Sequence, residues 1–239
     1  MPAVGGQRKN QSLKEKSIAA AVTSPSKFVE CRCPMNKEAA IKIIRECAFE
    51  YESNLVNRNI LFVFGAVNSL EFFDVLCLSH NFMHLTGIIA AGSLNSINFY
   101  NMTLDGRLAP ELFELNKDGT TEMKLSVLRH AMNIHKNAKM VGDYNASKIM
   151  LNTEKIIGNV TASLGFVLSK EYPDFFVPNT VLREDIRNIV HKPTKRVLAI
   201  FIKDKNADTY VECTYVAKGI SLEELLTHET LKTKINIEP

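Results

Sequence analysis

The sequence lacks the signatures of several common protein classes. Its five cysteines, Cys31, Cys33, Cys47, Cys77 and Cys213, are odd in number and irregularly spaced. This pattern argues against a disulfide framework and indicates a reducing compartment. One residue separates Cys31 from Cys33 and no second pair follows, so the spacing does not predict a zinc site. No apolar run reaches the ~18 residues of a membrane-spanning helix, and we expect a cytoplasmic protein, in a bacterial host cytosol, with no membrane partner.

Two large enzyme classes are also disfavoured. The glycine-containing segment at 87–92 lacks the Lys-Ser/Thr ending of a phosphate-binding loop, and no Gly-x-Ser-x-Gly nucleophile elbow occurs. The composition, 46% hydrophobic and 23% charged, is typical of a soluble globular domain. A net charge of +3 permits a nucleic-acid or acidic partner without requiring one.

The domain organisation follows from composition and hydrophobic pattern. Residues 1–33 are basic and polar, and we interpret them as a disordered tail. Residues 34–220 are predicted to form a single α+β domain, and residues 221–239 a C-terminal helix and tail. An organellar targeting peptide is a weaker interpretation of the first segment.

The first half of the domain has mainly helical periodicity. Asn36 can cap a helix that begins near Lys37. Two apolar runs separated by a turn, 60–64 and 70–78, predict a hairpin. Further helices are expected over 97–104 and from a cap at Thr120 or Thr121. In the second of these, Leu125, Leu128 and Met132 form the apolar stripe, and the other faces carry Lys124, Arg129, Lys136 and Lys139. Residues 140–145 have the pattern of a loop.

The second half has mainly strand periodicity. Short strands are predicted at 149–151, 155–157, 162–168 and 175–177, followed by a hairpin made by 196–203 and 209–217. A short helix over 183–190, capped by Asn179 or Thr180, is expected between them, and an amphipathic helix over 222–231 closes the fold. The fold class is therefore α+β, with N-terminal helices followed by a mainly antiparallel sheet.

One stretch, residues 76–88, places polar side chains in an otherwise apolar run. His80 and His84 are four residues apart, which on a helix puts both imidazoles on one side. Thr86 and Gly87 follow, and a histidine at the rim of an apolar segment suits acid–base chemistry. A hydrogen-bonded structural histidine is the common alternative. The pair lacks the glutamate and the third ligand of a zinc peptidase, so no metal site is predicted.

A second stretch, residues 178–187, carries two arginines. Arg183 and Arg187 are four apart, and a cationic edge beside a sheet suits phosphodiester recognition. A solvated helix face with local ion pairs is the ordinary alternative.

Cleavage of RNA without a metal or cofactor needs few groups. A base takes the 2′-hydroxyl proton, an acid protonates the leaving oxygen, and cations or hydroxyls stabilise the charged phosphorus centre. Side chains of the required types are His84, Thr86, Arg183, Arg187, Lys203, Thr214 and Tyr215.

Several of these residues carry a resemblance to a known family. The motif Asn-Phe-Met-His-Leu-Thr-Gly-Ile at 81–88, Lys-Leu-Ser-Val-Leu at 124–128, Ile-Gly-Asn at 157–159 and Pro-Asn-Thr-Val-Leu-Arg-Glu-Asp-Ile-Arg at 178–187 resemble a phage- and mobile-element-associated family. It is assigned to the barnase–EndoU–colicin–RelE (BECR) nuclease-like superfamily. The resemblance covers roughly residues 37–218.

The resemblance implies a fold and a site. It implies helices followed by an antiparallel sheet of about four strands that carries a metal-independent ribonuclease site. The implied catalytic residues are His84, Thr86, Arg183, Thr214 and Tyr215. Asn179 and Thr180 also fall in a matching motif, and we predict them as substrate-binding residues together with His80, Arg187 and Lys203 from the residue patterns.

Three functions are compatible with these patterns. The first is a toxin-like endoribonuclease, with RNA as its partner and a protein inhibitor or a host or phage protein as a second partner. The second is a non-catalytic protein that binds a nucleotide, a nucleic acid or a protein on the same fold during phage–host conflict. The third is an interaction role carried by the tail and the last helix.

Overall fold

The computed structural model describes residues 35–145 and 153–237, and the compact unit that they form begins at Met35. The predicted tail at 1–33 and the predicted strand at 149–151 lie outside the described residues. Within the described ranges, no helix is long and apolar enough to cross a membrane.

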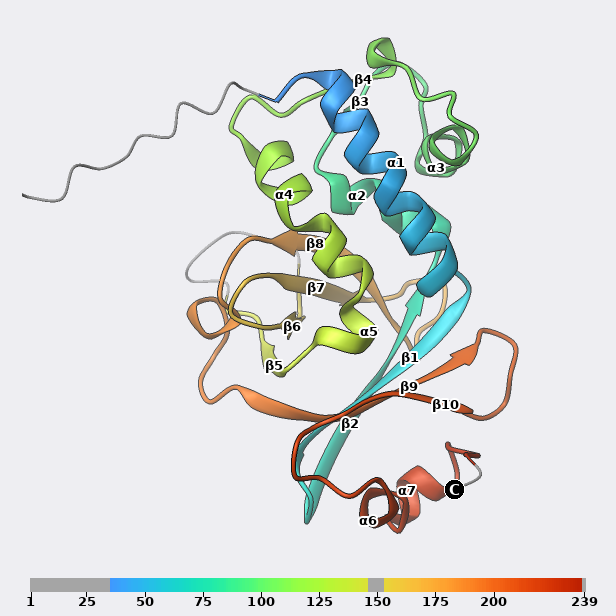
Figure 1. The fold of residues 1–239 in the computed structure, drawn as a ribbon, viewed down its shortest axis with the longest axis vertical. Coiled ribbons are helices and arrows are strands. Elements are labelled where there is room, and N and C mark those ends of the chain that lie inside the picture. The colour runs from blue at the N-terminus through green and yellow to red at the C-terminus, as the bar shows by residue number, and fades with distance from the viewer. Residues whose placement is uncertain (1–34, 146–152, 238–239) are drawn as a thin grey trace, which may run out of the picture. The chain divides into compact units, whose positions relative to one another are not determined.

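The described chain contains seven helices and ten strands (Figure 1). The helices are α1 (Lys37–Asn54), α2 (Phe82–Thr86), α3 (Ser96–Leu104), α4 (Thr120–Met132), α5 (Ile134–Asn137), α6 (Leu222–Leu226) and α7 (Glu229–Lys232). The strands are β1 (Arg58–Ala66), β2 (Ser69–Cys77), β3 (Ile89–Ala90), β4 (Phe113–Glu114), β5 (Met140–Asp143), β6 (Lys155–Gly158), β7 (Ser163–Leu168), β8 (Phe176–Leu182), β9 (Lys195–Asp204) and β10 (Glu212–Val216).

Eight of the strands form one sheet that closes on itself. Their order is β1-β2-β8-β7-β6-β5-β9-β10, and β1 also pairs with β9, so seven strands make a closed ring to which β10 is added. Neighbouring strands are antiparallel except for β2 and β8. The predicted α+β class and mainly antiparallel pairing are confirmed.

The predicted size of the sheet is wrong. Strands β5 to β8 do form a four-stranded antiparallel meander, but β1, β2 and β9 join its two edges. The hairpin of β1 and β2 also precedes all helices except α1, so helices and sheet are interleaved along the chain. Long apolar strands that pair with both edges remove the open edges of the meander.

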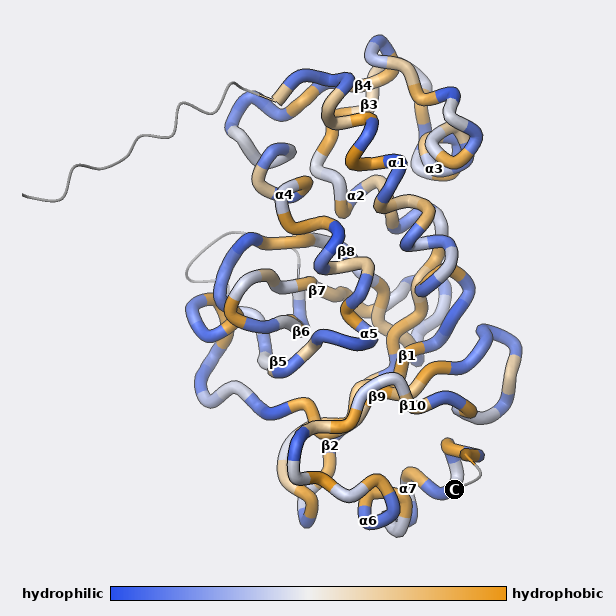
Figure 2. The backbone as a smooth tube through the Cα atoms, in the orientation of Figure 1, coloured by the Kyte–Doolittle hydropathy of each residue, from blue (hydrophilic) through white to orange (hydrophobic). Residues whose placement is uncertain are grey.

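The two faces of β1 explain the closure. Ile60, Phe62 and Phe64 point into the main core, while Leu61 and Val63 belong to a second apolar cluster on the other face. A strand that is buried on both faces has a continuous apolar sequence, as β1 and the middle of β9 do in Figure 2.

The C-terminal segment covers the outer face of β1 and β9. Leu225 and Leu231 from α6 and α7 pack in the second cluster. The predicted single helix over 222–231 is wrong, because His228 has an extended backbone, with φ −70° and ψ 124°, and divides it in two. Near this segment, the Tyr210 hydroxyl donates to the Asp74 carboxylate, which also accepts from Lys234 Nζ at 3.2 Å.

Two further segments differ from their predictions. Residues 140–145 contain strand β5, which pairs with β6 and β9, and are not a loop. Residues 183–190 contain a single turn of 3₁₀ helix, Ile186–Asn188, capped by Asp185. Asn179 and Thr180 do not cap it, because β8 continues to Leu182 in pairing with β7.

The ring has two different ends. At one end, Gly158 of β6 pairs with Ser163 of β7, which pairs with Leu182 of β8, and helices α2, α4 and α5 contact the sheet. We call this the helix-covered end. At the opposite end, Phe166 and Lys155 are paired and Phe176 begins β8.

Candidate functional site

The first histidine motif forms a short helix with defined ends. Asn81 Oδ1 accepts the backbone N–H of Leu78 at 3.0 Å, and Phe82 and Leu85 anchor α2 in the core. Gly87 ends α2 with φ +71°, a left-handed conformation that favours glycine. The helix therefore presents His84 at the surface while its apolar side is fixed.

Helix α4 holds this motif in place. Thr121 Oγ1 donates to the carbonyl of Gly87 at 2.6 Å, and Lys124 Nζ donates to the carbonyl of His84 at 3.0 Å. A Cβ added to Gly87 would lie 2.8 Å from Lys124 Cδ, so the lysine stem lies directly against the glycine. Two separate sequence motifs thus form one rigid corner.

The electrostatics of this corner favour a neutral imidazole. Partial burial lowers the pKa of His84 below its ordinary value of 6.5, and the charges of Lys124 and His80 lower it further. Burial also lowers the pKa of Lys124. His84 is therefore a neutral hydrogen-bond acceptor near pH 7, beside a cationic side chain.

Arg183 reaches the same helix from the sheet. It directly follows β8, and its backbone N–H contacts Met123 Sδ at 3.3 Å, one residue before Lys124. The Arg183 side chain is exposed. The structure therefore places His84 and the segment of Arg183 against the first half of α4, with His80 close enough to His84 to lower its pKa.

Lys124 was not predicted as a site residue. Sequence periodicity placed it on the solvated face of a helix, where lysines are common. The signal that could have identified it was its position at the start of the Lys-Leu-Ser-Val-Leu motif, one of the segments that carry the family resemblance.

Two of the predicted threonines lie in the interior. Thr86 is fully buried, and its hydroxyl donates to the carbonyl of Met83 at 2.7 Å. Thr180 is 5% exposed, and its Cγ2 would lie 2.8 Å from a Cβ added to Gly165. Asn179, its neighbour on β8, is half-buried. These contacts fix α2 and β8, and Thr86 and Thr180 do not reach the surface near His84.

The other predicted residues lie apart from His84. Thr214 donates to the carbonyl of His135 at 2.5 Å on α5, and Lys139 Nζ lies 3.9 Å from the ring centre of Tyr215. Lys124 and the end of α4 at Met132 are already separated by about 12 Å of helix. The predicted face pattern of β10 is interrupted by a register shift between Cys213 and Tyr215.

The remaining two cations have local partners. Arg187 is paired with Asp185 and does not form an edge with Arg183, because the predicted helix between them is absent. Lys203 donates to the carbonyl of Ala207 at 2.7 Å in the turn between β9 and β10.

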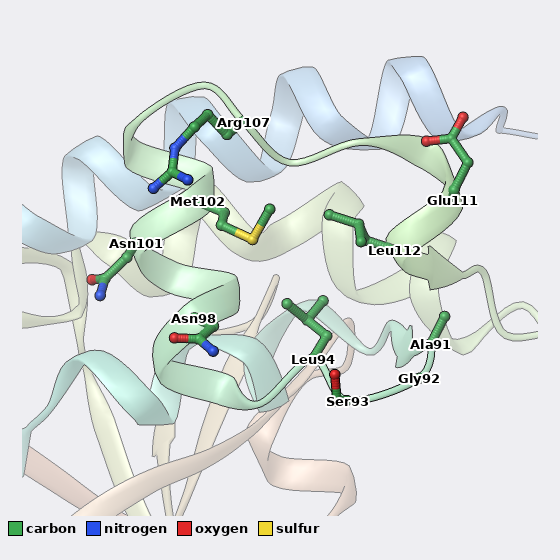
Figure 3. Close-up of a pocket in the computed structure, with 10 residues that line it drawn as sticks. All are labelled: Ala91, Gly92, Ser93, Leu94, Asn98, Asn101, Met102, Arg107, Glu111 and Leu112. Atoms are coloured by element: carbon green, nitrogen blue, oxygen red, sulfur yellow. The ribbon is translucent and has the colours of Figure 1, made fainter.

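A cavity of about 640 Å³ lies beside α3, apart from these groups. Figure 3 shows Leu94, Met102 and Leu112 pointing toward one another at its centre. It contains no histidine or lysine, and its charged lining residues are Arg107 and Glu111. Across residues 35–145 and 153–237, no group of three or more His, Cys, Asp or Glu side chains is arranged to hold a metal ion.

The sequence was compared with known proteins. The model of one family, phage-Barnase-EndoU-ColicinE5/D-RelE like nuclease 4, matches residues 43–219, about three quarters of the chain. The protein therefore belongs to this nuclease family of the BECR superfamily, as the motifs predicted. No curated protein and no solved structure gives a significant match.

Proposed function

We propose that the protein is an endoribonuclease that cleaves RNA by metal-independent acid–base catalysis. The observation that carries the proposal is the corner of α2 and α4, where a neutral His84 lies beside Lys124 and next to the segment of Arg183. These residues supply a base and two cations, and the neighbouring His80 would supply the acid that the reaction also needs.

The proposed reaction uses each group once. His84 takes the proton from the 2′-hydroxyl, and the resulting oxygen attacks the adjacent phosphorus. Lys124 and Arg183 stabilise the negative charge that develops on the phosphoryl oxygens. The bond to the 5′-oxygen breaks, and that oxygen receives a proton from the protonated form of His80. The products carry a 2′,3′-cyclic phosphate and a 5′-hydroxyl.

RNA is the proposed substrate because the nucleophile is internal to it. A DNA strand has no 2′-hydroxyl, so a histidine base without a metal-activated water cannot start the same reaction. As a toxin-like effector of phage or mobile-element origin, the protein would act in a bacterial cytosol, with a protein inhibitor or a host or phage protein as a partner.

The test compares three purified proteins on total RNA in EDTA, followed by mapping of the cleaved ends. The wild type should give discrete cuts with 2′,3′-cyclic phosphate ends. His84→Ala should lower the rate by about 10²-fold or more, because it removes the base. His130→Ala is the matched control, since His130 is an exposed histidine on α4 and should leave the rate unchanged. Equal cleavage by His84→Ala would refute the proposal.

One observation favours a second function, binding without catalysis. The hydroxyls of Thr86 and Thr214 are engaged with backbone carbonyls, so they do not supply transition-state donors in this structure. A non-catalytic protein that binds a nucleotide, a nucleic acid or a protein would need only the cations. Intact RNA in all lanes, together with RNA binding that Arg183→Ala removes, would support this second function.

A further inference from the structure

The end of the ring opposite the helices has charged side chains in inward-facing positions. Side chains two residues apart on a strand point to the same face. Glu71 therefore faces inward with the core residue Phe73, and Lys155 with the core residue Ile157. The inward side of the ring thus changes from apolar at its centre to charged at this end.

Two more strands repeat this arrangement. Asp143 follows the core residue Val141 on β5 by two positions, and Lys195 precedes the core residue Val197 on β9 by two positions. Four strands that are separate in the sequence therefore each place a charged side chain at the same rim. We call these four residues and the adjoining His191 and Lys192 the charged mouth.

The charged mouth encloses a cavity. It has a volume of about 200 Å³, and all six residues of the mouth line it. Phe64 and Val141, both core residues, also line it and give it an apolar floor. A cavity of this size accepts a phosphate group with part of a sugar but is too small for a folded partner.

The charges in the mouth do not cancel. Lys195 Nζ lies 2.6 Å from Glu71 Oε2, and Lys155 Nζ lies 2.5 Å from Asp143 Oδ1. Among the described residues Lys192 has no ion-pair partner, so three lysines face two carboxylates, and the partly positive rim is accessible to solvent.

We infer that the charged mouth is a binding site for a phosphate monoester. A phosphate dianion offers more acceptor oxygens than either carboxylate, so it can accept from Lys192 and compete for Lys155 and Lys195. Such a ligand would sit at the end of the ring opposite the helix-covered end that carries His84. The site therefore stands independently of the proposed nuclease.

The test is a calorimetric titration of the full chain with four probes at low ionic strength. The probes are inorganic phosphate, 5′-AMP, adenosine, and an RNA oligonucleotide with a 5′-phosphate. Binding of 5′-AMP without binding of adenosine is expected, and the first and fourth probes distinguish free phosphate from a nucleic-acid end as the source. Equal binding of 5′-AMP and adenosine, or no binding of any phosphate at millimolar concentration, would overturn the inference.

Variants make the test specific to the mouth. Lys155→Ala and Lys195→Ala should each weaken 5′-AMP binding by about tenfold. Lys232→Ala is the matched control, because Lys232 is also paired with a carboxylate, Glu229, but lies on α7. An equal loss in the control would mean non-specific attraction and would refute the site.

A substitution that should strengthen 5′-AMP binding gives the most specific test. Glu71→Gln releases Lys195 from its ion pair and should tighten 5′-AMP binding several-fold, whereas a purely structural pair predicts no gain. His84→Ala should bind 5′-AMP as the wild type does. Loss of binding in His84→Ala would place the phosphate at the helix-covered end and refute the inference.

Discussion

The two ends of the closed ring differ in whether their basic side chains are paired with carboxylates. At the helix-covered end, His84, Lys124 and Arg183 form no ion pair with a carboxylate among the described residues, and the pKa values of His84 and Lys124 are lowered. At the charged mouth, two of the lysines are each paired with a carboxylate. One end thus holds basic side chains without a paired carboxylate among the described residues, whereas at the other end two of three lysines are already paired.

This difference has a physical cause. Helices α2 and α4 partly remove His84 and Lys124 from water, and burial without a counter-charge disfavours their charged forms. The ion pairs of the mouth are partly exposed to solvent, so they contribute little to folding. The four predictions that follow test this contrast.

The largest effect is expected at His135, a buried histidine on α5 at the helix-covered end. His135 is 2% exposed, and burial, assisted by Lys136 and Arg58, lowers its pKa from 6.5 to about 4. Between these values the unfolded chain binds a proton that the folded chain does not, so stability is lost as the pH falls. His135 should account for up to about 3 kcal/mol of this loss between pH 7 and pH 4.

Denaturant unfolding at several pH values measures the contribution of His135 to the pH dependence of stability. His135→Gln should reduce the pH dependence of the free energy of unfolding, whereas His130→Gln, at an exposed site, should not. Parallel pH curves for the wild type and His135→Gln would show that the buried imidazole does not govern acid sensitivity.

The second effect concerns the coupling of Lys124 to His84. Lys124→Met keeps the aliphatic stem that lies against Gly87 but removes the charge, so the pKa of His84 should rise toward 6.5. NMR titration of His84 measures this shift directly. The acidic limb of cleavage should move upward in pH, with a rate loss on the order of tenfold. Lys195→Met at the mouth should leave both quantities unchanged, and a shift there would break the contrast.

A smaller effect is expected at Gly87. Gly87→Ala places a Cβ in a left-handed conformation and against Lys124 Cδ, which should lower the free energy of unfolding by about 1 kcal/mol. Gly92→Ala has the same strain with open space around its Cβ, so the difference between the two variants isolates the contact. Equal losses would mean that the lysine stem moves freely.

The smallest effect is expected at the mouth. Lys155→Met and Lys195→Met should each change the free energy of unfolding by less than about 0.5 kcal/mol, because both ion pairs are solvent-exposed. Thermal unfolding in low and high salt checks this. A loss above about 2 kcal/mol would show that these pairs are structural and would weaken the contrast between the ends.

The sequence predicted local structure better than assembly. The cap at Asn36, the hairpin of β1 and β2 and the helix at 96–104 were recoverable because each depends on residues close in the chain. The closure of the ring was not, because the pairings of β1 with β9 and of β2 with β8 join segments that are far apart. The helix expected over 183–190 was misassigned for a related reason, since β8 continues in pairing with β7 to Leu182 and leaves only a single 3₁₀ turn, Ile186–Asn188, after it.

In the candidate site too, the features that depend on nearby residues were predicted and those that depend on distant contacts were not. The spacing of His80 and His84 made them visible, and Arg183 was found through its motif. The convergence of both segments on α4, and the part played by Lys124, depend on contacts between distant segments. Periodicity also cannot distinguish a threonine hydroxyl that faces a ligand from one that, like Thr86, satisfies a carbonyl.

The segment after Gly219 determines which shortened fragments of this protein can fold. The family match stops at residue 219, yet Leu225 and Leu231 beyond it cover Leu61 and Phe201 on the outer face of the ring. A fragment trimmed to the matched boundaries would expose this apolar face and should aggregate. The matched region is thus shorter than the folded unit, and expression fragments should extend at least through Ile237.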